Sequence, residues 1–283
     1  MAQIESDDVS RQTDQPKAQV DMQMNEAEFR NKMLETEVTR TSNFLKWDWT
    51  GIRTLIEGPM LNPKRLDEAI NTGDFVKRLT GFYRPFKYKF SEIKNTKHNQ
   101  RYVQVGCSLI RCLLANPYGV RYLAENKMIR QLAECLSHFD RMSGLTSESP
   151  LFTAERLTDT LTGGYFDILG AMSADAGGIQ ILERWKIINM FYHIVELRGR
   201  DDLIKALLGK MDYTLDGHLR IIISKAMTSC TKEIRIFSTG LLRKYATRPV
   251  EASESTPVGS GVAEWAIRLL VTQLYDPEIE VCE

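Results

Sequence analysis

The sequence predicts an all-α protein in which groups of helices stack as structural repeats. Three observations lead to this prediction. Apolar residues recur every three to five positions from Asn25 onward, which is the spacing of an amphipathic helix. Alternating patterns typical of strands are scarce. Two stretches, 107–136 and 166–195, can also be aligned with each other, as expected for a repeat protein.

The chain begins with a polar segment and then becomes helical. Residues 1–23 carry few apolar side chains, so we expect them to be disordered. Residues 24–92 are expected to form a helical region, with Phe29 and Met33 on its first apolar face and a break at Gly58-Pro59. Trp47 and Trp49 are two positions apart and cannot share one helix face. We expect a core role for both, or a core role for one and a neighbouring segment or partner for the other.

The helical region ends in the basic, aromatic connector "FYRPFKYKF". Pro85 restricts the residue before it to an extended conformation. We therefore expect an extended connector between helical layers, with a short strand as the alternative.

The region 93–246 is predicted to hold the helical repeats. "CSLIRCLLANPYGVRYLAENKMIRQLAECL" aligns with "FDILGAMSADAGGIQILERWKIINMFYHIV" at a shift of 59 positions, which places Gly119 on Gly178. Each copy has a turn at the same place, "ANPYG" or "ADAGG". The unit is thus expected to be a helix, a turn, a short helix and a long helix with an apolar face. We expect Gly163-Gly164 and Gly177-Gly178 at turns that end helices.

The repeat length and the last helices favour a HEAT- or armadillo-like solenoid. A loop insertion at residues 140–153 accounts for 14 of the 59 positions, and the remaining 45 lie within the usual range of about 40–47. "TKEIRIFSTGLLRKYA" resembles the second helix of a HEAT repeat. Residues 247–261 are expected to form a flexible loop, and residues 262–283 to begin a further, truncated repeat. In that last segment, Asp276 is suited to cap a helix with Pro277 in its first position and Ile279 on its apolar face.

Composition excludes several classes of protein. Lys plus Arg equals Asp plus Glu at 37 each, whereas a general nucleic-acid binder is usually strongly basic. The five cysteines form no CxxC pair and mostly lie among apolar residues, so we expect reduced, buried thiols in a cytoplasmic protein. The sequence shows neither a signal peptide nor an apolar run of eighteen residues, and we expect no transmembrane segment.

Catalytic and metal sites are not expected. The sequence has no glycine-rich nucleotide loop, HExxH motif or GxSxG elbow, and we expect neither a cofactor nor enzymatic activity. Cys135 and His138 have a spacing that metal ligands can use, but a second pair is missing. His193 lies within an apolar helix and is interpreted as a packing residue.

One basic cluster is a candidate anion-binding site. Lys77, Arg78 and Arg84 lie near a helix end, and further Lys and Arg residues follow up to Arg101 with Glu92 as the only acid. Such a cluster can hold a phosphate through charge-assisted hydrogen bonds. The alternative interpretation is an exposed patch that only aids solubility.

Several longer strings resemble the Rictor family, the large helical-repeat subunit of TOR complex 2. They include "WDW", "FVKRLTGFYRP", "LTGGYFDILGAMS" and "RGRDDLIKALLGKMDYTLDGHLRIIISKAM". The resemblance runs from about Phe29 to Glu283, and the chain looks like a fungal member of the family. It identifies the chain as a fragment from the middle of a longer protein.

The resemblance implies a non-catalytic scaffold. Members of the family bridge the TOR kinase and the other subunits of the complex, and direct the kinase toward AGC-family kinases. This activity governs actin organisation, growth and stress responses, with the complex associating peripherally with the plasma membrane. A second interpretation is a regulatory module in which Lys77, Arg78 and Arg84 sense a nucleotide, an inositol phosphate or an anionic lipid.

Overall fold

The computed structural model describes residues 24–72, 74–140, 144, 150–247 and 260–282. The expected disorder of residues 1–23 and most of the two expected loops lie outside these residues. The described part is helical, with one isolated bridge between Lys94 and Thr160. Its α-helices are α2 Glu26–Glu35, α3 Trp49–Glu57, α4 Pro63–Asn71, α5 Phe75–Phe82, α6 Gln100–Leu114, α7 Pro117–Ala124, α8 Lys127–Ser137, α9 Ala154–Asp159, α10 Gly164–Ser173, α11 Ala176–Arg184, α12 Ile187–Ile194, α13 Asp201–Leu208, α14 His218–Ser229, α15 Lys232–Ala246, α16 Ser260–Gln273 and α17 Ile279–Cys282.

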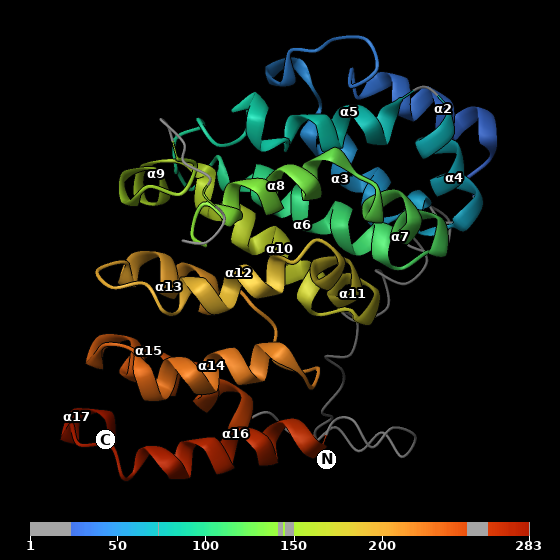
Figure 1. Ribbon diagram of the computed structural model, residues 1–283. Helices are drawn as coiled ribbons and strands as arrows, with labels where there is room; N and C mark the ends of the chain where they lie inside the picture. Colours follow the sequence, from blue (N-terminus) through green and yellow to red (C-terminus); the bar gives the residue numbers. More distant parts are fainter. Residues whose placement is uncertain (1–23, 73, 141–143, 145–149, 248–259, 283) are drawn as a thin grey trace, which may run out of the picture.

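The helices stack in layers that follow the order of the chain (Figure 1). The first layer contains α2 to α5, and after it come α6 to α8, then α10 to α12 with α13 beside them, then α14 and α15, and finally α16 and α17. Four short 3-10 turns, Phe44–Lys46, Pro59–Leu61, Pro85–Lys87 and Leu161–Gly163, connect helices. The prediction of an all-α helical-repeat stack is confirmed.

The aligned glycines occupy the same place in the two copies. A Cβ atom on Gly119 would lie 2.1 Å from the carbonyl oxygen of Leu113, and one on Gly178 would lie 2.0 Å from that of Met172. Leu113 and Met172 are themselves 59 positions apart. In both copies the short second helix therefore touches the end of the first helix, backbone against backbone, at a point where only glycine fits. We call α6–α8 unit one and α10–α12 unit two.

The predicted lengths within a unit were partly wrong. The third helix was expected to be the long one, but α8 has 11 residues and α12 has 8, whereas α6 has 15. The glycine pairs also lie at the starts of α-helices, although Gly163 is the last residue of the 3-10 turn Leu161–Gly163. Gly164 is the first residue of α10, and Gly178 is in the first turn of α11. Their role is close packing: a Cβ on Gly164 would lie 2.8 Å from the rings and methyl groups of Phe90 and Val103.

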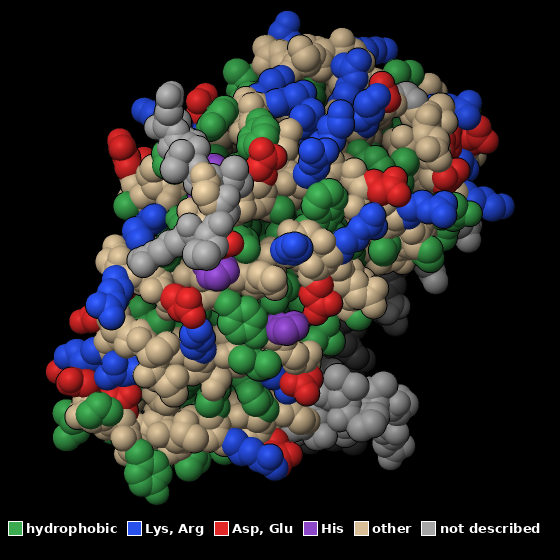
Figure 2. Space-filling model, in the orientation of Figure 1, with side chains coloured by type: hydrophobic (Ala, Val, Ile, Leu, Met, Phe, Trp, Pro, Cys, Tyr) green, Lys and Arg blue, Asp and Glu red, His purple; other side chains and the backbone are tan. Residues whose placement is uncertain are grey.

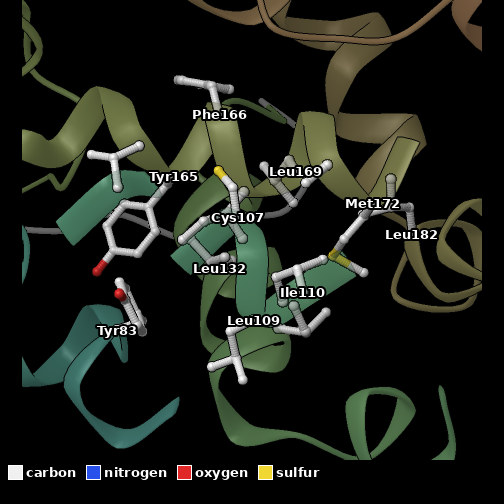
Figure 3. Packing of buried hydrophobic residues seen from close by; sticks show 14 of the residues in the cluster. Tyr83, Cys107, Leu109, Ile110, Leu132, Tyr165, Phe166, Leu169, Met172 and Leu182 are labelled. Carbon is white, nitrogen blue, oxygen red and sulfur yellow. The ribbon is translucent and has the colours of Figure 1, made fainter. Parts of the chain in front are cut away.

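The two units share a continuous apolar core. Ile110 of α6 and Met172 of α10 lie on the facing sides of these helices, where both side chains are buried (Figure 3). Cys107, Cys112 and Cys135 are buried in the same core. Burial raises the pKa of Cys135 to about 12, so its thiol stays protonated and packs as a small apolar group.

An aromatic cluster fills the first layer. Trp47 and Trp49 are both buried, their ring centroids are 5.5 Å apart, and both rings contact Phe82. The core role predicted for the two tryptophans is confirmed. They meet because Trp47 precedes α3 while Trp49 begins it, so the rule for a single helix face does not apply.

In the basic, aromatic connector Arg84, before Pro85, is extended as expected, but the residues that follow form neither an extended segment nor a strand. Pro85–Lys87 form a 3-10 turn, and Tyr88 follows in the left-handed region with φ of 55°. Phe90 then enters the core against Tyr83 and Tyr165. The aromatic residues are thus anchors of a tight turn, which the expectation of an extended connector missed.

The described end of the expected loop at 140–153 contains packed residues. Leu151 and Phe152 are buried, and the Phe152 ring lies 5.1 Å from that of Phe166. At the C-terminal side, Asp276 does accept a hydrogen bond from the Glu278 amide, but the helix begins at Ile279, beyond Pro277. Ile279 is exposed and Val281 is the buried residue.

Within the described ranges, we find no helix with the length and apolar character needed to cross a membrane.

Candidate anion-binding groove

The structure brings the three predicted residues of the basic cluster to one groove. Lys77 and Arg78 project from α5, and Arg84 lies directly after it. All three line a cavity of about 780 Å³ between the first layer and unit one. Two helices of unit one, α7 and α8, supply the opposite wall through residues 118–127. The groove is therefore built from segments that are separated by some forty positions in the sequence.

The two arginines are held by neutral acceptors. Arg78 Nη1 lies 3.5 Å from the carbonyl oxygen of Val38, and Arg84 Nε donates to Gln131 Oε1 at 3.3 Å. Both contacts fix the guanidinium groups without neutralising their charge. Lys77 differs, because its Nζ atom lies 3.1 Å from a carboxylate oxygen of Asp74. That pair is on the surface and contributes little binding free energy.

Further cations line the same groove, and sequence reasoning placed only some of them near it. Lys87 and Lys89 belong to the basic run that follows Arg84, whereas Arg121 and Lys127 come from unit one. Seven Lys and Arg side chains line the groove against two acids, Asp67 and Glu125. In Figure 2 the Lys and Arg side chains gather over the upper part of the molecule. A chain with no net charge thus concentrates positive charge at this place.

The cations of the groove repel one another. The pKa of Lys87 is lowered, first by partial burial and then by the positive charges of Arg84 and Lys89. A negative group in the groove would relieve this repulsion. Perturbed groups of this kind gather at functional sites more often than elsewhere.

Polar and aromatic groups form the remaining wall. The hydroxyl groups of Thr80 and Tyr122 are 2.9 Å apart, and Asn126 Nδ2 donates to Thr80 Oγ1 at 3.4 Å. Burial raises the pKa of Tyr122. Tyr118 is more than half exposed at the edge of the groove. On α7, Tyr118, Arg121 and Tyr122 have helical spacing, so the sequence signal for this wall was a polar, aromatic face opposite the buried Leu123.

The arrangement suits the binding of an anion. Ammonium and guanidinium groups can donate charge-assisted hydrogen bonds to phosphate or carboxylate oxygens. Within the residues that the structure describes, three or more His, Cys, Asp or Glu side chains nowhere gather in a group able to hold a metal ion. Cys135 is buried and His193 is half-buried in α12, as expected for packing residues.

Comparison with known proteins identifies the family. Residues 143–246 match the family model described as the middle domain of the rapamycin-insensitive companion of mTOR. The Schizosaccharomyces pombe protein "Target of rapamycin complex 2 subunit ste20" is 45% identical over 96% of this chain and 20% of its own length. The Saccharomyces cerevisiae protein "Target of rapamycin complex 2 subunit TSC11" is 32% identical over 88% of this chain and 18% of its length.

An animal relative shows the same pattern. The human rapamycin-insensitive companion of mTOR is 30% identical over 86% of this chain and 13% of its length. The chain spans about a fifth, or less, of the length of these curated relatives. The family model and the relatives agree with the strings identified in the sequence and with the helical stack. The chain belongs to the Rictor family, and residues 143–246 correspond to the middle domain of that family.

Proposed function

We propose that this chain is a non-catalytic part of the scaffold of TOR complex 2. The observation that carries the proposal is its similarity over nearly its whole length to proteins named as subunits of that complex. The fold supports the same role. Each layer seals its apolar face against the next, and the sides of the stack stay available to other proteins.

The finer parts of the proposal follow from the family. The scaffold helps to assemble the TOR kinase with its other subunits and directs it toward AGC-family kinases, and through them toward actin organisation, growth and stress responses. We place the protein in the cytoplasm, with peripheral association of the complex with the plasma membrane. The described surface offers apolar contacts on its last layers, where Ile221, Ile267 and Val271 are about half exposed.

Native purification of the tagged protein from cells tests the scaffold. The TOR kinase is expected to co-purify with it. Gly178→Ala should reduce this recovery because it disturbs unit two, whereas Gly240→Ala, where an added Cβ meets open space, should not. Failure to recover any other subunit of the complex with the unaltered protein would reject the proposal.

A second candidate function is anion sensing by the groove. The observation that favours it is the presence of seven Lys and Arg side chains along one cavity, including Lys77, Arg78 and Arg84. An anion bound there would join the first layer to unit one and so stabilise the fold.

A thermal-shift measurement with inorganic tripolyphosphate tests this second function. Stabilisation is expected for the unaltered chain and should be lost when Lys77, Arg78 and Arg84 are all changed to Glu. Changing Lys64, Lys94 and Lys97 to Glu provides a control with the same charge difference at exposed positions that do not line the groove. An unchanged melting temperature at saturating tripolyphosphate would reject the function.

A further inference from the structure

Two of the short 3-10 turns carry the same sequence pattern. Phe44–Lys46 reads FLK and Pro85–Lys87 reads PFK, so each turn holds a large apolar residue, Leu45 or Phe86, followed by a lysine. Leu45 is 71% exposed and Phe86 is 46% exposed, and the lysine after each is exposed as well. We propose that these two turns and the basic groove beside them form a docking surface for an anionic lipid bilayer. The inference rests on the cations of the second candidate function, and it adds that the anions belong to a membrane surface.

The geometry of the turns directs the two apolar side chains outward. A 3-10 helix has three residues per turn, so consecutive side chains point in directions about 120° apart. The Phe44 ring lies 4.9 Å from that of Phe82 in the first layer, and Pro85 is buried. Because the first residue of each turn is anchored inward, the second, Leu45 or Phe86, is left in solvent.

The two turns flank the same groove. One residue from each turn, Phe44 and Lys87, lines it, whereas the two exposed apolar residues do not. Lys89 Nζ donates to the carbonyl oxygen of Ser42 at 3.1 Å, which links the segment after the second turn to the segment before the first. Both segments belong to the end of the stack that the first layer forms (Figure 1). The exposed apolar side chains therefore stand at the rim of the cavity and outside it.

Charge complementarity selects an anionic surface as the occupant. Residues 38–47 and 75–91, which contain the two turns, hold seven Lys and Arg and neither Asp nor Glu. Basic side chains are attracted to the headgroups of anionic lipids. Large apolar side chains next to them can enter the boundary between headgroups and acyl chains, while the lysines extend back to the headgroups. Single exposed apolar residues are ordinary, and the evidence here is that both turns present one beside the same cations.

A bilayer fits this arrangement better than a protein partner does. A partner helix is usually bound in an apolar groove that accepts a stripe of its side chains. Here the cavity is lined by seven cations, and the exposed apolar residues lie outside it. Exposed apolar residues also occur in the last layer, at Ile267 and Leu274, but residues 260–282 contain one cation and four acids. That end of the stack lacks the positive charge that would attract an anionic bilayer.

Vesicle flotation measures the docking. The chain is expected to bind vesicles of phosphatidylcholine that contain about 30% phosphatidylserine, but not vesicles of phosphatidylcholine alone. Leu45→Ser and Phe86→Ser together should weaken this binding about tenfold or more, because two apolar side chains no longer enter the bilayer. Both residues are exposed, so the melting temperature should stay unchanged. Ile267→Ser with Leu274→Ser is the matched control at the other end of the stack and should leave the affinity unchanged.

Quenching by brominated lipid gives a second readout, which reports insertion directly. Leu45→Trp places an indole on the first turn, and brominated phosphatidylcholine in the anionic vesicles should quench its fluorescence. Ile267→Trp is the control and should show no more quenching than the unaltered chain. Both the binding and the quenching should be lost at about 1 M salt, where surface charges are screened.

The outcomes separate this inference from anion sensing. Stabilisation by tripolyphosphate without vesicle binding, or vesicle binding that does not depend on Leu45 and Phe86, would overturn the inference and leave anion sensing intact. Vesicle binding that depends on both residues, without stabilisation by tripolyphosphate, would remove anion sensing and support the inference. If the two serine changes reduce recovery of another subunit of the complex but leave vesicle binding unchanged, the surface belongs to a protein partner and the inference is overturned.

Discussion

Unit one and unit two share a backbone contact but differ in how their third helix begins. Both have a glycine packed against a carbonyl oxygen six positions earlier, and both cap the second helix with a short polar side chain, Asn116 or Asp175. At the third helix, Asn126 caps α8, whereas its equivalent in unit two is Trp185.

This exchange has a structural reason. Trp185 Nε1 donates to the carbonyl oxygen of Ala124 at 3.1 Å, which joins unit two to unit one. Without a capping side chain, the chain enters α12 through Lys186 in the left-handed region, with φ of 58°. Both units thus have the contact between glycine and carbonyl oxygen. Unit two lacks the side-chain cap of the third helix and has instead the hydrogen bond from Trp185 to unit one.

The largest expected effect tests the shared contact. Gly119→Ala and Gly178→Ala should each lower the free energy of unfolding by about 3 kcal/mol, because the added Cβ would overlap a carbonyl oxygen. Urea denaturation gives the measurement. Gly240→Ala in α15 is the matched control, since its Cβ meets open space, and it should raise stability by about 0.5–1 kcal/mol. Equal effects at all three glycines would show that the close contact is not decisive.

The next effect concerns the bond between the units. Trp185→Phe keeps an aromatic ring but removes the donor to Ala124, and should lower the free energy of unfolding by about 1.5 kcal/mol. Amide hydrogen exchange should become faster in α11 and α12 before it does in α6. An unchanged exchange pattern would mean that apolar packing alone joins the units.

A smaller effect compares the two caps. The side chain of Asn116 accepts from the Tyr118 amide at 3.0 Å, and that of Asp175 accepts from the Gly178 amide at 3.0 Å. Asn116→Ala and Asp175→Ala should each cost about 1 kcal/mol in urea denaturation. A clear difference between the two would show that the units depend on their caps unequally.

The smallest effect is a gain in stability at the point where the units differ. Lys186→Gly relieves the left-handed backbone at an exposed position and should raise the free energy of unfolding by about 0.5 kcal/mol, after the greater entropy of the unfolded chain is included. Lys127→Gly is the control and should be destabilising, because Lys127 is the first residue of α8. A loss of stability in both variants would contradict the interpretation of Lys186.

The sequence predicted the layers well because they depend on local periodicity. The alignment of Gly119 with Gly178 identified a contact between backbones, since such a contact admits only one residue type. The tight turn at Pro85–Lys87 was missed, because it depends on the burial of Phe90 against Tyr165, a residue far along the chain. The part of the groove that was predicted is also the part that is local in the sequence. Lys77, Arg78 and Arg84 are close in sequence, but Arg121 and Lys127 join them only through the stacking of unit one on the first layer.

The short helix α7 faces two directions. Tyr118, Arg121 and Tyr122 line the groove, while the carbonyl oxygen of Ala124, at the end of the same helix, holds the indole of Trp185. One wall of the groove and the acceptor of the bond between the units thus belong to one helix of eight residues. An anion bound in the groove would therefore contact the same short helix that accepts the hydrogen bond from unit two.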